Sequence, residues 1–275
     1  MAEHAILCED LWHVYPGDVI ALQNANLAVH KGEILGVVGQ NGSGKTTLVK
    51  HFNGLLKPTR GRVLIAGQDS SKRPVHELAR HAGYVFQNPN HQLFATTVAA
   101  ELAFGPKNFG LKPKEVEARV ADAVEFFDIA PLLEQHPYRV SFPMRKLIAM
   151  ASIYTMQPSV FVLDEPTTGQ DHNGANMVRR LVRRLREMGR TVIVVSHDMA
   201  LIAEVADRVV ALWSSEIIGL GSPREIFADY AVMERTKLNP PQITEFSRRW
   251  KGNASRRLAL TVAEAVQDIV DAVEK

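Results

Sequence analysis

One glycine-rich loop limits what this chain can fold into more than any other segment. It consists of Gly39, Gln40, Asn41, Gly42, Ser43, Gly44, Lys45 and Thr46. The loop matches the pattern G-x-x-x-x-G-K-S/T, whose glycines let the backbone curl until successive N–H groups point at phosphate oxygens. An apolar run at 34–38 precedes it and a segment of helical character follows from Thr47, so the helix N-terminus would add positive charge. The loop and Thr47 therefore predict a site for a nucleotide's phosphates, with Lys45 at the β- and γ-phosphates and Thr46 at Mg²⁺.

Polar side chains follow two other apolar segments. Asp164 and Glu165 come after the run at 161–163, and His197 comes shortly after the run at 191–195. In open α/β sheets the ligand lies at the carboxyl ends of the strands, so we expect these side chains beside the phosphates. We predict that Asp164 holds Mg²⁺ through water, Glu165 polarises the attacking water and His197 contacts the γ-phosphate. Taken alone, the acidic pair also fits an ordinary surface pair, and the histidine also fits a structural role.

The order of strand and helix patterns defines the fold class. Residues 5–36 predict short strands separated by turns, and further strands are expected at 62–66, 160–163 and 191–195. Residues 90–157 are helical by pattern and divided by prolines, which indicates a helical insertion between strands. A later amphipathic helix carries one apolar face, made of Val178, Leu181, Val182 and Leu185. This alternation predicts an α/β fold with a mainly parallel, doubly wound sheet.

The character of the sequence changes after about residue 232. We therefore assign residues 1–231 to the main domain and 232–275 to an appended tail. A break is expected at 239–241, and Thr261 to Glu264 predict a capping box that opens a helix. That helix has one apolar face, made of Val262, Val266, Ile269, Val270 and Val273.

Composition and charge exclude several classes of protein. The formal net charge is +2, so no global attraction to nucleic acid is expected, and the arginine-rich run at 179–186 fits the solvated face of the amphipathic helix. The one cysteine, Cys8, excludes an internal disulfide framework. The start of the chain lacks the pattern of a signal peptide, and no apolar run approaches the roughly 18 residues of a membrane span. The histidines show no paired ligand spacing, so we predict no structural metal. If the protein works at a membrane, we expect another chain to hold it there.

The phosphate loop, the Asp-Glu strand end and the strand-end histidine together resemble the ATP-binding cassette (ABC) family over about residues 5–230. The resemblance implies a phosphate-loop ATPase with an N-terminal antiparallel β subdomain and a helical subdomain. Gln87 resembles the family's glutamine, which senses Mg²⁺ and meets the membrane partner. Tyr15 resembles the aromatic residue that stacks on adenine, with an ordinary turn tyrosine as the alternative. Asp171 resembles the aspartate of the loop that crosses the dimer interface.

A narrower resemblance, to the ATPases of energy-coupling factor importers, rests on residues 86–94 and 103–106. Residues 240–244 and 261–264 extend it into the tail, which in that subgroup helps two ATPases hold each other. Such importers take up vitamins and transition metals such as cobalt and nickel. The resemblance implies a peripheral ATPase on the cytoplasmic face of the membrane, with a transmembrane scaffold and a substrate-binding membrane subunit as partners. Asn90 and His91 stand where acidic residues are usual, which weakens the expectation for the contact with the scaffold.

The chain departs from the ABC pattern at the signature close to L-S-G-G-Q, where only Ser141 survives. Phe142 and Pro143 replace the two glycines, so bulk is added and one backbone N–H is lost. Gln170 also stands where leucine is usual, beside Asp171. Each ATP of a cassette dimer lies between one subunit's phosphate loop and the other's signature. We therefore expect this chain to pair with a second ABC ATPase that has an intact signature, in preference to a homodimer.

Two other functions remain open from the sequence. One is a soluble ABC ATPase that acts outside transport, although such proteins usually carry two cassettes or a long coiled coil. The other is a regulatory partner that binds ATP with little hydrolysis, against which the intact Glu165 and His197 argue. The cargo cannot be named, because other subunits recognise it.

Overall fold

The computed structural model describes residues 4–251 and 258–273. The strand that leads into the glycine-rich loop lies inside a six-stranded sheet. The strand order is β10-β9-β3-β8-β7-β6; β10 runs antiparallel to β9, and the other neighbours are parallel. The strands are β3 (Ile34–Gly39), β6 (Ala82–Val85), β7 (Val160–Asp164), β8 (Thr191–Val195), β9 (Arg208–Trp213) and β10 (Glu216–Gly221). The prediction of an α/β fold with a mainly parallel sheet is confirmed.

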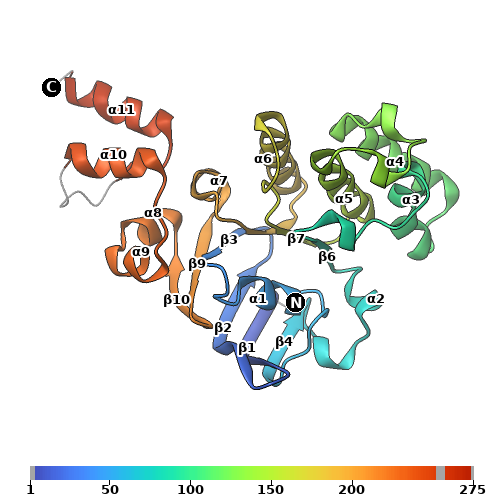
Figure 1. Cartoon of the computed structure of the whole chain (residues 1–275), viewed down its shortest axis with the longest axis horizontal. Helices are drawn as coiled ribbons and strands as arrows, with labels where there is room; N and C mark the ends of the chain where they lie inside the picture. Colours follow the sequence, from blue (N-terminus) through green and yellow to red (C-terminus); the bar gives the residue numbers. More distant parts are fainter. Residues whose placement is uncertain (1–3, 252–257, 274–275) are drawn as a thin grey trace.

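A second, antiparallel sheet lies beside the first and is drawn at the bottom of Figure 1. Its order is β2-β1-β4-β5. The strands are β1 (His4–Tyr15), β2 (Val19–His30), β4 (Arg60–Ile65) and β5 (Gln68–Asp69). The first two are 12 residues each, longer than the short strands expected from the sequence. The turn between them contains Gly17 at a φ of 84°, a conformation that glycine adopts without steric cost.

Consecutive residues of the central strands point into two different hydrophobic cores. On β3, Ile34 and Val38 belong to one core, whereas Leu35 and Val37 belong to the other. The first core is shared with α5 (Phe142–Met156), α6 (His172–Glu187) and α7 (Met199–Val205). The second is shared with the antiparallel sheet and with α1 (Lys45–His51). Burial on both faces explains why these strands are continuously apolar rather than alternating.

The region between β6 and β7 is helical, as predicted, and lies to one side of the sheets in Figure 1. It contains α3 (Val98–Asn108), α4 (Pro113–Phe127) and α5. Phe127 of α4 and Tyr154 of α5 are buried against each other, with ring centroids 5.8 Å apart. A short helix, α2 (Val75–Leu78), precedes this region.

The C-terminal part contains α8 (Pro223–Ala228), α9 (Tyr230–Thr236), α10 (Gln242–Lys251) and α11 (Val262–Val273), and the last two project from the body in Figure 1. The predicted division between residues 231 and 232 falls inside α9, where Val232 is buried in the first core, and the division itself stays a prediction. Residues 252–257 and 274–275 of the predicted tail lie outside the described residues.

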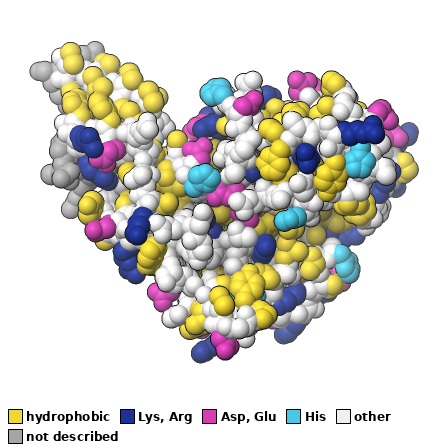
Figure 2. Space-filling view, viewed as in Figure 1, with side chains coloured by type: hydrophobic (Ala, Val, Ile, Leu, Met, Phe, Trp, Pro, Cys, Tyr) yellow, Lys and Arg dark blue, Asp and Glu magenta, His cyan; other side chains and the backbone are white. Residues whose placement is uncertain are grey.

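The start of α11 forms half of the predicted capping box, because Glu264 accepts the N–H of Leu260 in place of that of Thr261. The Thr261 hydroxyl accepts the Glu264 N–H at 3.2 Å, while the Glu264 carboxylate accepts the Leu260 N–H and pairs with Arg224 of α8. Figure 2 shows hydrophobic side chains gathered on the projecting end of the molecule. The exposed apolar residues of α11 are Val262, Val266, Ile269, Val270 and Val273.

We predict that Leu181→Ala lowers the free energy of unfolding by about 2–5 kcal/mol, because it opens a cavity in the first core. Leu181 is 1% exposed on the apolar face of α6. Leu220→Ala is the matched control, because Leu220 is 44% exposed on β10; its effect is expected within about 0.5 kcal/mol. Urea unfolding of the two variants measures both values, and equal losses would contradict the assignment of this core.

Candidate active site

The glycine-rich loop connects β3 to α1 and requires glycine at both of its ends. Gly39 has a φ of 149°, and a Cβ there would lie 2.4 Å from the Leu212 carbonyl oxygen. Gly44 has a φ of 101°, and a Cβ there would lie 2.4 Å from the Ala21 carbonyl oxygen. Because both obstacles are backbone atoms, no side chain fits without moving a neighbouring strand. Close packing therefore requires the same glycines that the sequence pattern assigns to phosphate binding.

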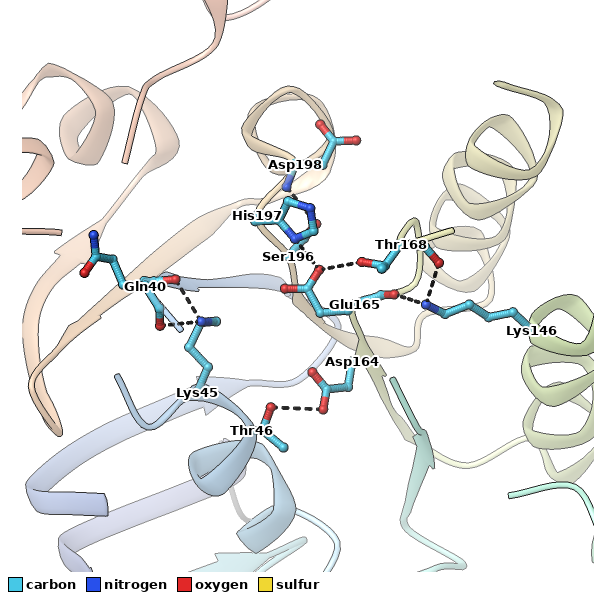
Figure 3. Close-up of polar contacts among 11 residues, drawn as sticks. Gln40, Lys45, Thr46, Lys146, Asp164, Glu165, Thr168, Ser196, His197 and Asp198 are labelled. Atoms are coloured by element: carbon cyan, nitrogen blue, oxygen red, sulfur yellow. Dashed lines mark hydrogen bonds and ion pairs between the residues drawn. The ribbon is translucent and has the colours of Figure 1, made fainter. Parts of the chain in front are cut away.

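Lys45 lies inside this loop and is almost completely buried. Its Nζ donates to the carbonyl oxygens of Gly39 and Gln40, both at 2.8 Å (Figure 3). Burial lowers the pKa of Lys45, and the nearby carboxylates of Glu165 and Asp164 partly oppose that effect. A desolvated ammonium held in this way interacts strongly with any anion that enters the loop.

Asp164 ends β7 and faces the loop. Its Oδ2 accepts hydrogen bonds from the Thr46 hydroxyl at 3.2 Å and the Tyr84 hydroxyl at 2.7 Å. Burial raises the pKa of Asp164, whereas these two hydrogen bonds lower it. Its Oδ1 is buried and has no hydrogen-bond partner within the described residues.

These oxygen atoms fit a magnesium ion. Mg²⁺ prefers carboxylate and hydroxyl oxygens together with phosphate and water, and the free Oδ1 of Asp164 is the kind of buried acceptor that needs a partner. Thr46 and Asp164 are the residues that would hold the ion. Gln87, also predicted for this role, lines a cavity together with Thr46.

Glu165 and His197 form the second half of the site. The Glu165 Oε2 lies 2.8 Å from the His197 Nδ1 and accepts the Thr168 hydroxyl at 3.2 Å (Figure 3). The Glu165 side chain is 9% exposed, whereas that of His197 is 67% exposed. The backbone of Glu165 has a φ of 51°, an uncommon conformation for a residue with a side chain. A buried carboxylate oriented by a histidine at the edge of a phosphate site is an arrangement suited to a general base.

A cavity of about 470 Å³ brings most of the predicted site residues together. The predicted residues among its lining are Tyr15, Asn41, Gly42, Gly44, Lys45, Thr46, Thr47, Gln87 and Glu165. The Tyr15 hydroxyl lies 3.3 Å from the Thr47 hydroxyl. Ser43 is buried within the loop. The roles given to these residues remain predictions, although their common location is a feature of the structure.

The signature segment and the crossing loop lie elsewhere. Ser141 precedes α5, the Phe142 ring packs against Gly169, and the Pro143 carbonyl accepts the Gln170 side-chain amide at 3.1 Å. Asp171 caps α6 by accepting the Gly174 N–H at 2.8 Å. Within a single chain, Phe142 and Pro143 therefore contact the loop that precedes Asp171, and none of these residues lines the cavity.

Sequence reasoning missed Tyr84, Thr168 and Lys146. Tyr84 and Thr168 donate to the two strand-end carboxylates, and the buried Lys146 donates to the carbonyls of Glu165 and Thr168. Burial lowers the pKa of Lys146 to about 8. Tyr84 had one usable signal, since it lies three residues before Gln87 on the strand next to β7. No sequence pattern predicts the contacts of Thr168 and Lys146.

Comparison with known protein families decides which family this fold belongs to. A family model described as ABC transporter matches residues 22–168, which include the phosphate loop, the signature segment and the Asp-Glu pair. The chain belongs to the ABC transporter ATP-binding family. Members of this family hydrolyse ATP, and the roles of the individual site residues of this ABC ATPase stay predictions.

Relatives of this ABC ATPase extend the match over nearly the whole chain. The Energy-coupling factor transporter ATP-binding protein EcfA of Methanoculleus marisnigri is 39% identical over 98% of both chains. A Putative ABC transporter ATP-binding protein of Caldanaerobacter subterraneus is 42% identical over 89% of this chain, which spans 43% of that longer relative. The solved structure of cbiO1 from Clostridium perfringens has a TM-score of 0.74 and 32% identity, covering 89% of this chain and 98% of that one.

We predict that Tyr15→Ala weakens ATP binding about 5- to 150-fold, because stacking of a base on an aromatic ring contributes about 1–3 kcal/mol. Tyr15→Phe keeps the ring, loses the contact with Thr47 and is expected to bind within about threefold of the original. Tyr230→Ala is the control, since Tyr230 is 71% exposed on α9. Titration with a fluorescent ATP analogue measures all three, and unchanged binding by Tyr15→Ala would exclude adenine stacking.

Proposed function

We propose that this ABC ATPase is the peripheral ATP-hydrolysing subunit of an energy-coupling factor importer. It would power uptake of a vitamin or a transition metal ion through a transmembrane partner at the cytoplasmic face of the membrane. The observation that carries the proposal is the Glu165–His197 pair at 2.8 Å beside Lys45 and Asp164, in a chain similar to EcfA over nearly its full length. The first feature supports hydrolysis, and the second supports the type of transporter.

Each side chain has one task in the proposed reaction. Lys45 and the backbone N–H groups of the loop hold the β- and γ-phosphates in place. Mg²⁺, held by Thr46 and Asp164, neutralises phosphate charge when it is bound. Glu165 accepts a proton from the attacking water, and the hydrogen bond from His197 keeps that carboxylate oriented. With Nδ1 directed at Glu165, the Nε2 of His197 is left to face the γ-phosphate.

We predict that Glu165→Gln abolishes hydrolysis while ATP still binds, because the amide cannot take a proton from water but fills the same space. In the complex captured from membranes, the ATPase rate is expected to fall at least about 100-fold with binding within about threefold. Glu187→Gln, at the exposed end of α6, is the control. A normal rate in the Glu165→Gln complex would contradict the catalytic assignment and favour a purely regulatory ATP-binding subunit.

The departures at Phe142 and Pro143 support a dimer of two different ATPases. Pro143 has no N–H, and the Phe142 side chain is partly exposed at the start of α5. Each lost charge-assisted hydrogen bond to a phosphate would cost about 1.5–3 kcal/mol. A homodimer would contain two such weakened sites, whereas a heterodimer would contain one site with an intact signature.

The apolar face of α11 supplies a surface for such pairing. Its exposed valines and isoleucine leave a projecting helix with no partner for its apolar side among the described residues. Exposed apolar patches of this kind mark contacts with other proteins. We propose that this face contacts the second ATPase.

A separate groove suits the transmembrane partner. Phe94 and Phe104 pack edge to face at 4.6 Å between ring centroids and remain 59% and 45% exposed. They line an apolar hollow between α2 and α3. Helix α3 follows β6 and Gln87 in the chain. Across the described ranges, no helix has the length and apolar character to cross a membrane. The groove is therefore the place where we propose that a membrane subunit docks and is moved by the ATPase.

We expect the purified chain alone to hydrolyse ATP at less than about one tenth of the rate of the captured complex, because each lost phosphate contact costs at least tenfold. Phosphate release measured over a range of protein concentrations checks this. Addition of the co-purified second ATPase should restore the rate. Robust, cooperative ATP hydrolysis by the isolated homodimer would contradict the heterodimer hypothesis.

A further inference from the structure

A completely buried lysine reaches the catalytic loop from α5. Lys146 is 0% exposed, and its Nζ donates to the carbonyl of Glu165 and, at 3.0 Å, to the carbonyl of Thr168. Figure 3 shows the side chain extending from its helix to these two oxygens. Burying an ammonium carries a large desolvation cost, so a lysine with two backbone acceptors at this depth needs an explanation.

The two acceptors are the ends of one tight turn. The Glu165 carbonyl also accepts the Thr168 N–H at 3.3 Å, and the Thr168 hydroxyl donates to the Glu165 carboxylate at 3.2 Å. Glu165 itself has a φ of 51°. A residue with a side chain keeps such a conformation only where its surroundings over-determine it. The ammonium of Lys146 supplies one of those restraints, at the residue that carries the proposed catalytic carboxylate.

The first turn of α5 holds the other end of the same loop. The Gln170 Nε2 donates to the Pro143 carbonyl at 3.1 Å, and the Phe142 ring lies against Gly169. Gly174 leaves room for the Gln170 side chain, because a Cβ there would lie 1.9 Å from its Oε1. Two departures from the ABC pattern, Pro143 and Gln170, therefore contact each other.

We propose that Lys146 is a positioning residue for Glu165, and that with the Gln170–Pro143 contact it latches the loop 165–170 to the start of α5. The proposal rests on the proposed function in so far as Glu165 is the catalytic base. These contacts with α5 lie between residues 141–143, which would face the partner's nucleotide, and the carboxylate of Glu165. A change at the dimer face thereby reaches Glu165 through backbone atoms, without any contact between the two nucleotides.

The test compares Lys146→Met, which removes the donors, with Lys146→Gln, which keeps N–H donors on a shorter side chain. Thr155→Val is the matched control, because Thr155 is buried on the same helix and donates to the Leu102 carbonyl, away from the loop. Hydrogen exchange of peptides covering residues 164–171 is measured on the full chain. Steady-state ATP hydrolysis is measured on the complex captured from membranes.

We expect Lys146→Met to exchange the 164–171 amides about tenfold faster and to lower kcat about 10- to 100-fold, since small misplacements of a reacting group have effects of that size. KM is expected to stay within about twofold, because Lys146 touches no predicted phosphate ligand. Lys146→Gln should recover part of kcat, and Thr155→Val should match the original chain. Gln170→Leu removes the other contact between the loop and α5 and should lower kcat about two- to fivefold, as for one lost hydrogen bond. If Lys146→Met does not fold, this variant tests whether contact with α5 positions Glu165.

Unchanged exchange and kcat in folded Lys146→Met would overturn the proposal, as would equal losses in Thr155→Val. Failure of the proposed function looks different. In that case Glu165→Gln leaves hydrolysis by the complex untouched, while Lys146→Met still loosens the 164–171 segment in the isolated chain.

Discussion

Parallel pairing in the central sheet is the constraint on which the rest of the site depends. Val195 of β8 is paired with Val37 of β3 on one side and with Asp164 of β7 on the other. Because this row crosses three parallel strands near their carboxyl ends, every residue one or two positions further on emerges at the same edge. Gly39, Glu165 and His197 are among those residues. Burial on both faces of the sheet fixes this register, since a slip of one residue would exchange the two hydrophobic cores.

The sequence predicts the parts of the site that depend on strand ends. The phosphate loop, the Asp-Glu pair and His197 each follow from a local pattern. A polar group that ends a buried parallel strand lies at the edge of the sheet where ligands bind. The alternation of strands and helices, the helical insertion and the N-terminal cap of α11 were predictable for similar reasons.

What the sequence did not predict depends on contacts between distant segments. Tyr84 reaches Asp164 only because β6 lies next to β7 in one register, and Lys146 reaches Glu165 only because of the rotation of α5 about its axis. Neither quantity is written in a short motif. A buried lysine in particular contradicts the usual expectation that lysine lies at the surface. Such exceptions to the usual burial preferences are expected at functional sites, where the chemistry requires a polar group inside the protein.

The exposure of His197 has a consequence for energy use. Its side chain is 67% open to solvent in the single chain, although it orients a carboxylate that is itself nearly buried. In water at high dielectric constant, a hydrogen bond to an exposed imidazole competes with solvent and holds the carboxylate weakly. The same bond strengthens when a second protein surface covers it and excludes water. In the proposed pair of ATPases, cover over His197 would therefore make nucleotide consumption depend on assembly.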